Sequence, residues 1–281
     1  EINGPMGMDK KTHIRSLLSL DTARSQWKEK YGRCWDEEDV ERLYAAFEDE
    51  LYRVAAEYSS PIAGTVEAVE ELRKMGIAIG STTGYTSEMM KQVAPAAEKY
   101  GYKPDCIVTP DVTGAGRPTP FMMYECMRRL NVYPPCAVVK AGDTITDIRE
   151  GKNGGAWSIG ILTGSNLLGL TKEEYETMGQ EELAQRKEEA KKRYMEAGAD
   201  MVIDSIRDLP QAIREINRRM QEEKKDECVL YPGAGHPGKR KHGKDSAAGK
   251  RDSSGGRKRA SFGMGQSCFF YGTISGTDGS E

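Results

Sequence analysis

CAVVKAGDTITDIREGKNGGAWSIGIL, residues 136–162, contains two short apolar runs on either side of a polar segment. The runs predict strands that end at Lys140 and Leu162, and the segment between them predicts a helix over 145–153. A strand, a helix and a second strand of these lengths form a βαβ unit, in which the two strands are parallel. The stretch therefore indicates an α/β fold built on a parallel sheet.

The same alternation of helix and strand continues on both sides of this stretch, from Pro61 to Met220. Because parallel crossovers are right-handed, such a series forms a doubly wound open sheet, with its ligand beyond the carboxyl ends of the strands. The pattern predicts further strands at 77–82, 106–109 and 200–205, and helices over 65–75, 87–100, after Pro118 and over 209–220.

Residues 1–60 have an all-helical pattern. Apolar side chains recur every three or four positions from Val40 to Tyr58, and Asp36 is placed to cap the start of this helix. Two shorter helices are predicted over 13–20 and 21–31. The chain therefore divides into a helical domain at 1–60 and an α/β domain at 61–220.

Residues 221–281 lose the apolar periodicity, and Gly, Ser and Lys dominate them. Such a composition cannot offset the entropy of ordering, so we expect a disordered tail whose removal leaves thermal stability unchanged. The basic clusters at 238–244 and 256–261 could bind nucleic acid, but no aromatic residues interleave them, which favours a solvated run. The stretch GAGHPGK at 233–239 satisfies two phosphate-loop patterns, but no good helix follows it, so we expect no nucleotide site.

The overall composition is nearly neutral, with 41 Lys and Arg against 44 Asp and Glu and a net charge of −3. A nucleic-acid role therefore cannot rest on total charge, and none is expected. No apolar window has the length of about 18 residues that a membrane span needs, so we expect a soluble, cytoplasmic protein. The six cysteines form no C-x-x-C pair, which argues against a zinc cage or a disulfide framework.

Polar side chains follow three of the predicted strands and should meet at one edge of the sheet. A hydroxyl and a guanidinium suit phosphate oxygens, and carboxylates suit a hard cation such as Mg²⁺. Each residue alone also fits a helix cap or a solvated loop, so the prediction of a phosphoryl-transfer site depends on the whole set. The set is Thr83, Tyr85, Arg117, Asp143 and Asp147.

The motifs STTGYT at 81–86, GRP at 116–118 and GDTxxD at 142–147 resemble the second to fourth motifs of the haloacid-dehalogenase superfamily. Within it, PMGxxK at 5–10 with His13 and the stretch GSNLLGLTKEE resemble the phosphonoacetaldehyde hydrolase (phosphonatase) family. The resemblance implies a HAD-like Rossmannoid core, a helical cap domain at 1–60, Mg²⁺, and a homodimer paired through the caps.

The resemblance also implies the reaction, which is hydrolysis of the phosphorus–carbon bond of phosphonoacetaldehyde. A cap lysine condenses with the aldehyde, and the protonated imine accepts the electrons of the departing carbon. This lysine is Lys10, with Lys11 as its rival, and His13 shuttles protons on the same helix face. The other implied roles are lining of the lysine's approach by Met6 and Gly7, phosphoryl binding by Thr83 and Arg117, substrate contact by Tyr85, and metal binding by Asp143 and Asp147.

The sequence departs from the superfamily in one respect, because it contains no D-x-D-x-[TV] motif. That motif carries the nucleophilic aspartate on the first strand, so we expect the chain to lack one strand of the core and to be inactive alone. Two alternatives remain open. One is a capped phosphatase acting on a small phosphate ester, and the other is a non-catalytic binding protein that uses the basic tail.

Overall fold

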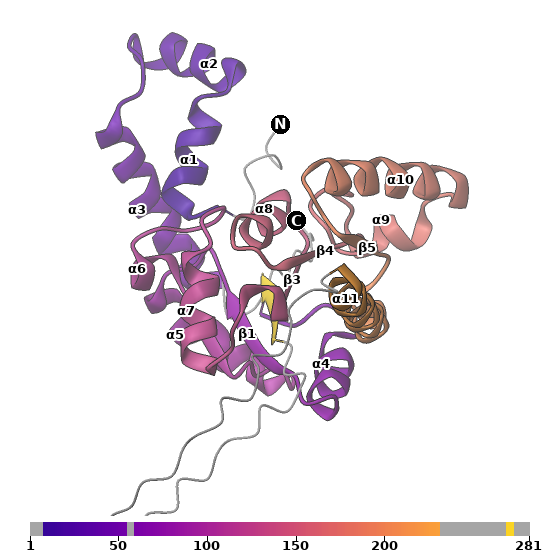
Figure 1. Ribbon diagram of the computed structural model, residues 1–281. Coiled ribbons are helices and arrows are strands. Elements are labelled where there is room, and N and C mark those ends of the chain that lie inside the picture. Colours follow the sequence, from indigo (N-terminus) through magenta and orange to yellow (C-terminus); the bar gives the residue numbers. More distant parts are fainter. Residues whose placement is uncertain (1–7, 55–58, 231–267, 273–281) are drawn as a thin grey trace, which may run out of the picture. The chain divides into compact units, whose positions relative to one another are not determined.

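The computed structural model describes residues 8–54, 59–230 and 268–272 (Figure 1). The chain forms two compact units, residues 1–213 with 266–281, and residues 214–265. Helix α11 (Leu209–Leu230) begins in the first unit and ends in the second. The sheet and all predicted site residues belong to the first unit. In the described part of the chain, no helix is both long and apolar enough to cross a bilayer.

Three helices form the amino-terminal part, α1 (Lys10–Leu18), α2 (Asp21–Tyr31) and α3 (Glu37–Val54), as the sequence predicts. Helix α1 begins three residues earlier than expected, because the Asp9 carboxylate caps it by accepting from the Thr12 amide at 3.0 Å. Ion pairs Lys11–Glu41 and Arg15–Glu37, at 2.7 and 2.8 Å, fasten α1 to α3. The cap places Lys10 in the first turn of α1.

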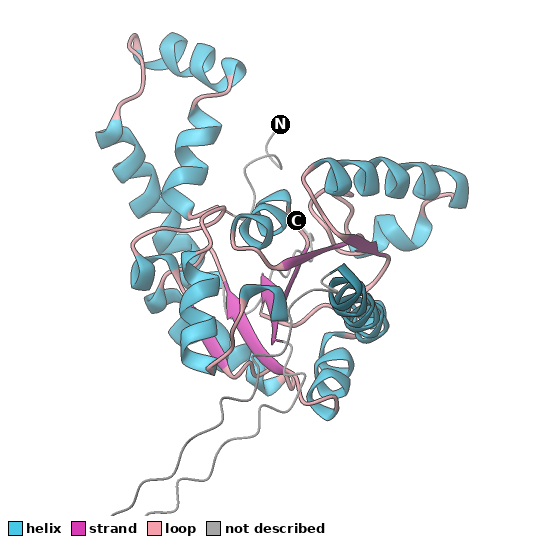
Figure 2. Ribbon diagram, viewed as in Figure 1, coloured by secondary structure: helices cyan, strands magenta, loops and turns pink. Residues whose placement is uncertain are grey.

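Six parallel strands form one sheet in the order β2-β1-β6-β3-β4-β5, which confirms the predicted parallel α/β class (Figure 2). Five of them were expected from the sequence, with bounds that shift by up to two residues. They are β1 (Ala78–Thr82), β2 (Cys106–Val108), β3 (Val138–Gly142), β4 (Trp157–Ile161) and β5 (Met201–Ile203).

Helices cover both faces of this sheet, as a doubly wound fold requires. On β2, Ile107 packs with α5 (Ser87–Lys99), whereas its neighbour Val108 packs with α7 (Phe121–Leu130). Adjacent strand residues point to opposite faces, so α5 and α7 lie on opposite sides. Helix α8 (Ile145–Asn153) packs on β3 and β4. The remaining short elements are α4 (Thr65–Lys74), α6 (Pro110–Thr113), η1 (Pro135–Ala137) and η2 (Ile206–Asp208).

The sixth strand differs from the prediction, because β6 (Cys268–Gly272) comes from the tail that was expected to be disordered. It pairs with β1 on one side and β3 on the other, in the middle of the sheet. The expected gap in the core is therefore filled by a segment of the same chain. CFFYG is a short apolar run, and such runs form strands inside parallel sheets. This run is only five residues long and follows a long polar stretch, so the composition of the whole tail predicted disorder.

Two helices and the last ten residues of a third were not predicted from the sequence. Helices α9 (Lys172–Thr177) and α10 (Gln180–Glu196) lie in a region where no element was expected, and α11 continues ten residues past Met220. Helix α10 is highly charged and buries only Leu183, Ala190 and Tyr194. An apolar stripe this thin gives a weak periodic signal.

Candidate active site

The carboxyl ends of β1 and β3 are level with each other. Thr82 and Gly142 both pair with Gly272, so Thr83 and Asp143 follow equivalent positions on the two strands. Both side chains are buried. The structure thus places the hydroxyl and the carboxylate at the same edge of the sheet, on either side of β6.

Arg117 and Asp147 form a buried ion pair at this edge. Their side chains are 1% and 0% exposed, and Lys140 on β3 adds a second cation, 3.0 Å from the same Asp147 oxygen. Burial alone would raise the pKa of Asp147, but the charges of Arg117 and Lys140 outweigh it and hold the pKa below its usual value. Asp147 is therefore an anion that binds two cationic side chains.

The loop before α8 fixes the Asp147 side chain in this position. Thr144 caps α8 by accepting from the Asp147 amide, and the Asp147 carboxylate accepts from the Thr144 amide in return, at 3.2 Å each. A side chain at Gly142 would collide with Asp147. The GDTxxD motif is thus a capping box with a glycine that leaves room for the second aspartate.

Lys10 lies on the cap side of the same site. Its Nζ atom is 5.0 Å from the centre of the Tyr85 ring and 5.9 Å from that of Phe47. Burial, and then the positive charge of Arg117, lower the pKa of Lys10 from 10.5 to about 8. The amine is therefore half-buried among aromatic rings and within electrostatic reach of the core guanidinium.

Lys11 points in another direction. Its amine binds the Glu41 carboxylate at 2.7 and 2.8 Å and lies 4.9 Å from the centre of the Tyr44 ring. The side chain is 38% exposed. Of the two neighbouring lysines, only Lys10 contacts Tyr85, a residue of the sheet edge.

Three of the remaining predicted residues, His13, Thr83 and Tyr85, lie in the described part of the chain. His13 is half-buried on α1, one turn from Lys10. The Thr83 hydroxyl accepts from the Tyr85 amide at 3.2 Å, and burial raises the pKa of Tyr85. Met6 and Gly7 lie outside the described residues.

The donor set fits a Mg²⁺ ion only in part. Protein Mg²⁺ sites use one or two carboxylates together with substrate phosphate and water. Asp143 can supply one carboxylate, whereas that of Asp147 already carries Arg117 and Lys140. Residues 8–54, 59–230 and 268–272 contain no group of three His, Cys, Asp or Glu side chains that could hold an ion by themselves.

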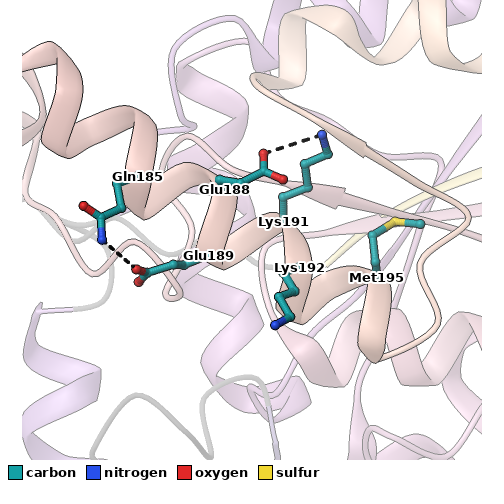
Figure 3. Close-up of a pocket in the computed structure, with 6 residues that line it drawn as sticks. All are labelled: Gln185, Glu188, Glu189, Lys191, Lys192 and Met195. Atoms are coloured by element: carbon teal, nitrogen blue, oxygen red, sulfur yellow. Dashed lines mark hydrogen bonds and ion pairs between the residues drawn. The ribbon is translucent and has the colours of Figure 1, made fainter.

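Three residues at this edge were not predicted. Lys140 and Glu150 join the ion network, and Tyr194 on α10 donates its hydroxyl to the Asp143 carbonyl at 2.7 Å. A lysine near the end of an otherwise apolar predicted strand was the one visible signal, since a charged side chain is almost never buried unless it is paired. A surface hollow along α10, from Gln185 to Met195, contains none of the site residues (Figure 3).

Comparison with known proteins agrees with this geometry. The profile of the haloacid dehalogenase-like hydrolases matches residues 6–155, and a second HAD-hydrolase-like profile matches 114–209. A phosphonoacetaldehyde hydrolase of Bacillus cytotoxicus is 45% identical over 219 residues, which cover 78% of this chain and 83% of that protein. The chain belongs to the phosphonoacetaldehyde hydrolase family. This confirms the family resemblance seen in the motifs.

Other relatives of this family support the same conclusion. A phosphonoacetaldehyde hydrolase of Parabacteroides distasonis is 44% identical over 77% of this chain and 82% of that protein. A bifunctional phosphonoacetaldehyde hydrolase/aminoethylphosphonate transaminase of Clostridioides difficile is 44% identical over 83% of this chain and 37% of that protein. The crystal structure of a phosphonoacetaldehyde hydrolase-like protein from Oleispira antarctica superimposes with a TM-score of 0.75, at 34% identity over 77% of this chain and 79% of that one.

Proposed function

We propose that this site binds phosphonoacetaldehyde, and that in the complete enzyme it is hydrolysed to acetaldehyde and phosphate through an imine on Lys10. The observation that carries the proposal is the half-buried Lys10 amine beside Tyr85 and near Arg117. A phosphatase of the same fold acts without a lysine imine. The depressed pKa of this amine therefore favours the phosphonate reaction over the hydrolysis of a phosphate ester.

The amine and the aldehyde form the imine with loss of one water. The Lys10 amine must be neutral to attack the carbonyl carbon, and its lowered pKa supplies that form near neutral pH. In the complete enzyme the aspartate of the D-x-D-x-[TV] segment attacks phosphorus and takes up the phosphoryl group, and water then hydrolyses the aspartyl phosphate to release phosphate. As the phosphorus–carbon bond breaks, its electrons move into the protonated imine and form an enamine. Protonation of the enamine carbon and hydrolysis then release acetaldehyde and restore the amine. His13, one turn along α1, is the proposed proton carrier.

Arg117 and Thr83 are the proposed partners of the phosphonate oxygens. The Arg117 Nε atom is buried without a hydrogen-bond partner among the described residues, so it can donate to a bound oxygen. We assign Asp143 as the carboxylate that would hold Mg²⁺, and Asp147 as its neighbour that acts through Arg117. When bound, the ion would supply positive charge to the phosphonate oxygens.

We further propose that the chain pairs with a second copy through its cap and acts in the cytoplasm. Helix α2 buries none of its residues, and its Trp27 and Tyr31 rings are in tilted contact with centroids 4.5 Å apart, which leaves an aromatic surface for a partner. Four cysteines, Cys34, Cys106, Cys126 and Cys136, are free thiols, as in a reducing compartment. Sedimentation of the chain and of a Trp27→Glu variant tests the dimer, since the variant should be monomeric.

The first test concerns the missing motif. We expect the 281-residue chain to show no hydrolysis of phosphonoacetaldehyde, because it contains no D-x-D-x-[TV] sequence to supply a nucleophile. Adding an upstream segment with a D-x-D-x-T strand should restore release of phosphate, measured colorimetrically. Full turnover by the chain as printed would show that another group attacks phosphorus.

The second test concerns the charge state of Lys10. Because only the neutral amine forms an imine, the rate of borohydride-trapped labelling with acetaldehyde should rise with pH around a midpoint of about 8. In Arg117→Met the charge that adds to the effect of burial is lost, so the midpoint should move to higher pH. A midpoint near the ordinary lysine value of 10.5 in the unmodified chain would contradict the assignment.

A further inference from the structure

Lys140 is a lysine whose every donor is used inside the protein. An ammonium group has three N–H donors. They reach the Thr82 hydroxyl at 2.9 Å, one Asp147 oxygen at 3.0 Å and one Glu150 oxygen at 2.9 Å. Lys140, Asp147 and Glu150 are 0% exposed. Lys140 therefore has no donor left for a substrate, although it lies beside the site.

Lys140 connects β3 to β1, two strands that are not neighbours in the sheet. Thr82 is on β1 and Lys140 on β3, and the two strands are separated by β6. Strands two places apart are separated by about 10 Å. The Lys140 side chain thus reaches across the middle strand to Thr82, while Asp147 and Glu150 come from α8 above it.

Glu150 completes this arrangement. Its Oε2 atom accepts from Lys140 and from the Thr82 hydroxyl, at 2.9 and 3.0 Å. Two carboxylates, Asp147 and Glu150, then balance two cations, Lys140 and Arg117. A buried charge that loses its counter-charge is strongly destabilised, so each member of the network constrains the others.

We propose that Lys140 and Glu150 are positioning residues that set the phosphonate preference of the site. Glu150 and Thr82 hold the Lys140 ammonium, Lys140 holds one oxygen of Asp147, and that same oxygen binds Arg117. The network therefore fixes the guanidinium before an oxyanion arrives. The inference rests on the proposed function, since it assigns to Arg117 the binding of the phosphonate.

The test compares two aldehydes in the same trapping experiment. Phosphonoacetaldehyde carries the group that Arg117 would bind, whereas acetaldehyde does not. In the 281-residue chain, borohydride labelling of Lys10, measured by mass spectrometry, should favour phosphonoacetaldehyde. In Glu150→Gln and Lys140→Met we expect this preference to fall about tenfold or more, with acetaldehyde labelling unchanged, because misplacement of a binding group by about 1 Å has large effects.

Asp200→Asn provides a matched control. Asp200 is also paired, to Lys152 at 3.0 Å and to the Ser158 amide at 2.8 Å, but it lies before β5, at the opposite edge of the sheet. The Asp200→Asn variant should keep the full preference for phosphonoacetaldehyde over acetaldehyde. Thr82→Val, which removes one hydroxyl and keeps the shape, serves if Lys140→Met does not fold, and circular dichroism checks each variant.

The labelling experiment separates failure of the proposed function from failure of the positioning role of Lys140 and Glu150. If the unmodified chain shows no labelling of Lys10 by either aldehyde, the proposed function is wrong. If it shows the preference and folded Glu150→Gln and Thr82→Val keep it in full, the positioning role of the network is refuted. A loss of labelling by both aldehydes in folded Glu150→Gln also counts against the inference, because it would indicate an effect on the lysine rather than on phosphonate binding.

Discussion

Lys10→Ala is expected to abolish borohydride trapping of phosphonoacetaldehyde on the protein. The imine forms only on an amine that is neutral and close to the bound carbonyl, and Lys10 has a pKa lowered to about 8 and lies 5.0 Å from the Tyr85 ring. Loss of this one half-buried amine should remove the covalent adduct completely, which intact-mass spectrometry would detect directly. This effect on the adduct does not require the nucleophile.

Lys11→Ala is the matched control for this prediction. Lys11 differs by one position, is exposed, and binds Glu41 on α3. Exposed ion pairs contribute about 1 kcal/mol or less, so the variant should fold normally and keep the adduct. An adduct that persists in Lys10→Ala and disappears in Lys11→Ala would move the reaction to Lys11.

The strand-end residues could be predicted because they depend on local order. Polar residues that follow strands of a parallel sheet must lie at one edge, whatever the details of packing. Thr83 and Asp143, which directly follow β1 and β3, therefore needed only the correct assignment of the strands, whereas Arg117 lies beyond α6 in the connection after β2. The resemblance named Lys10, with Lys11 as its rival, and which of the two amines lies beside Tyr85 depends on where α1 starts and hence on the Asp9 cap.

The buried network could not be predicted in the same way. Lys140 lies within a strand and Glu150 within a helix, where a charged side chain usually points to solvent. Their pairing depends on α8 lying over β3 and on Gly151, where a side chain would collide with Ser158 and Lys140. Such complementarity joins residues that are distant in sequence, and no periodic pattern records it.

The strand from the tail shows the same limit for the fold. Its sequence, CFFYG, suits a buried strand, but nothing local says which neighbours it will pair with. The structure inserts it between β1 and β3, with five register pairs on each side. The tail thus contributes to the core through pairing across more than a hundred residues of chain, which a composition-based prediction of disorder does not detect.

Deletion of residues 266–281 should therefore lower the thermal stability of the chain strongly, in contrast to the expectation from composition. Without β6 the sheet separates into β2-β1 and β3-β4-β5, and both new edges lose their ladder partners. Buried backbone groups left without a partner cost about 1–3 kcal/mol each, so we expect the melting temperature to fall by about 10 °C or more. Differential scanning calorimetry measures this effect.

Phe270→Pro tests the same point without a truncation. Proline cannot donate to a ladder and is not tolerated in a strand that is paired on both sides, so we expect a loss of about 5 °C or more. Lys172→Pro is the control, because position 172 is the first residue of α9, where proline fits and the preceding Thr171 is already extended. Equal melting temperatures for the two proline variants would mean that the stability of the sheet does not depend on the pairing of β6 with β1 and β3.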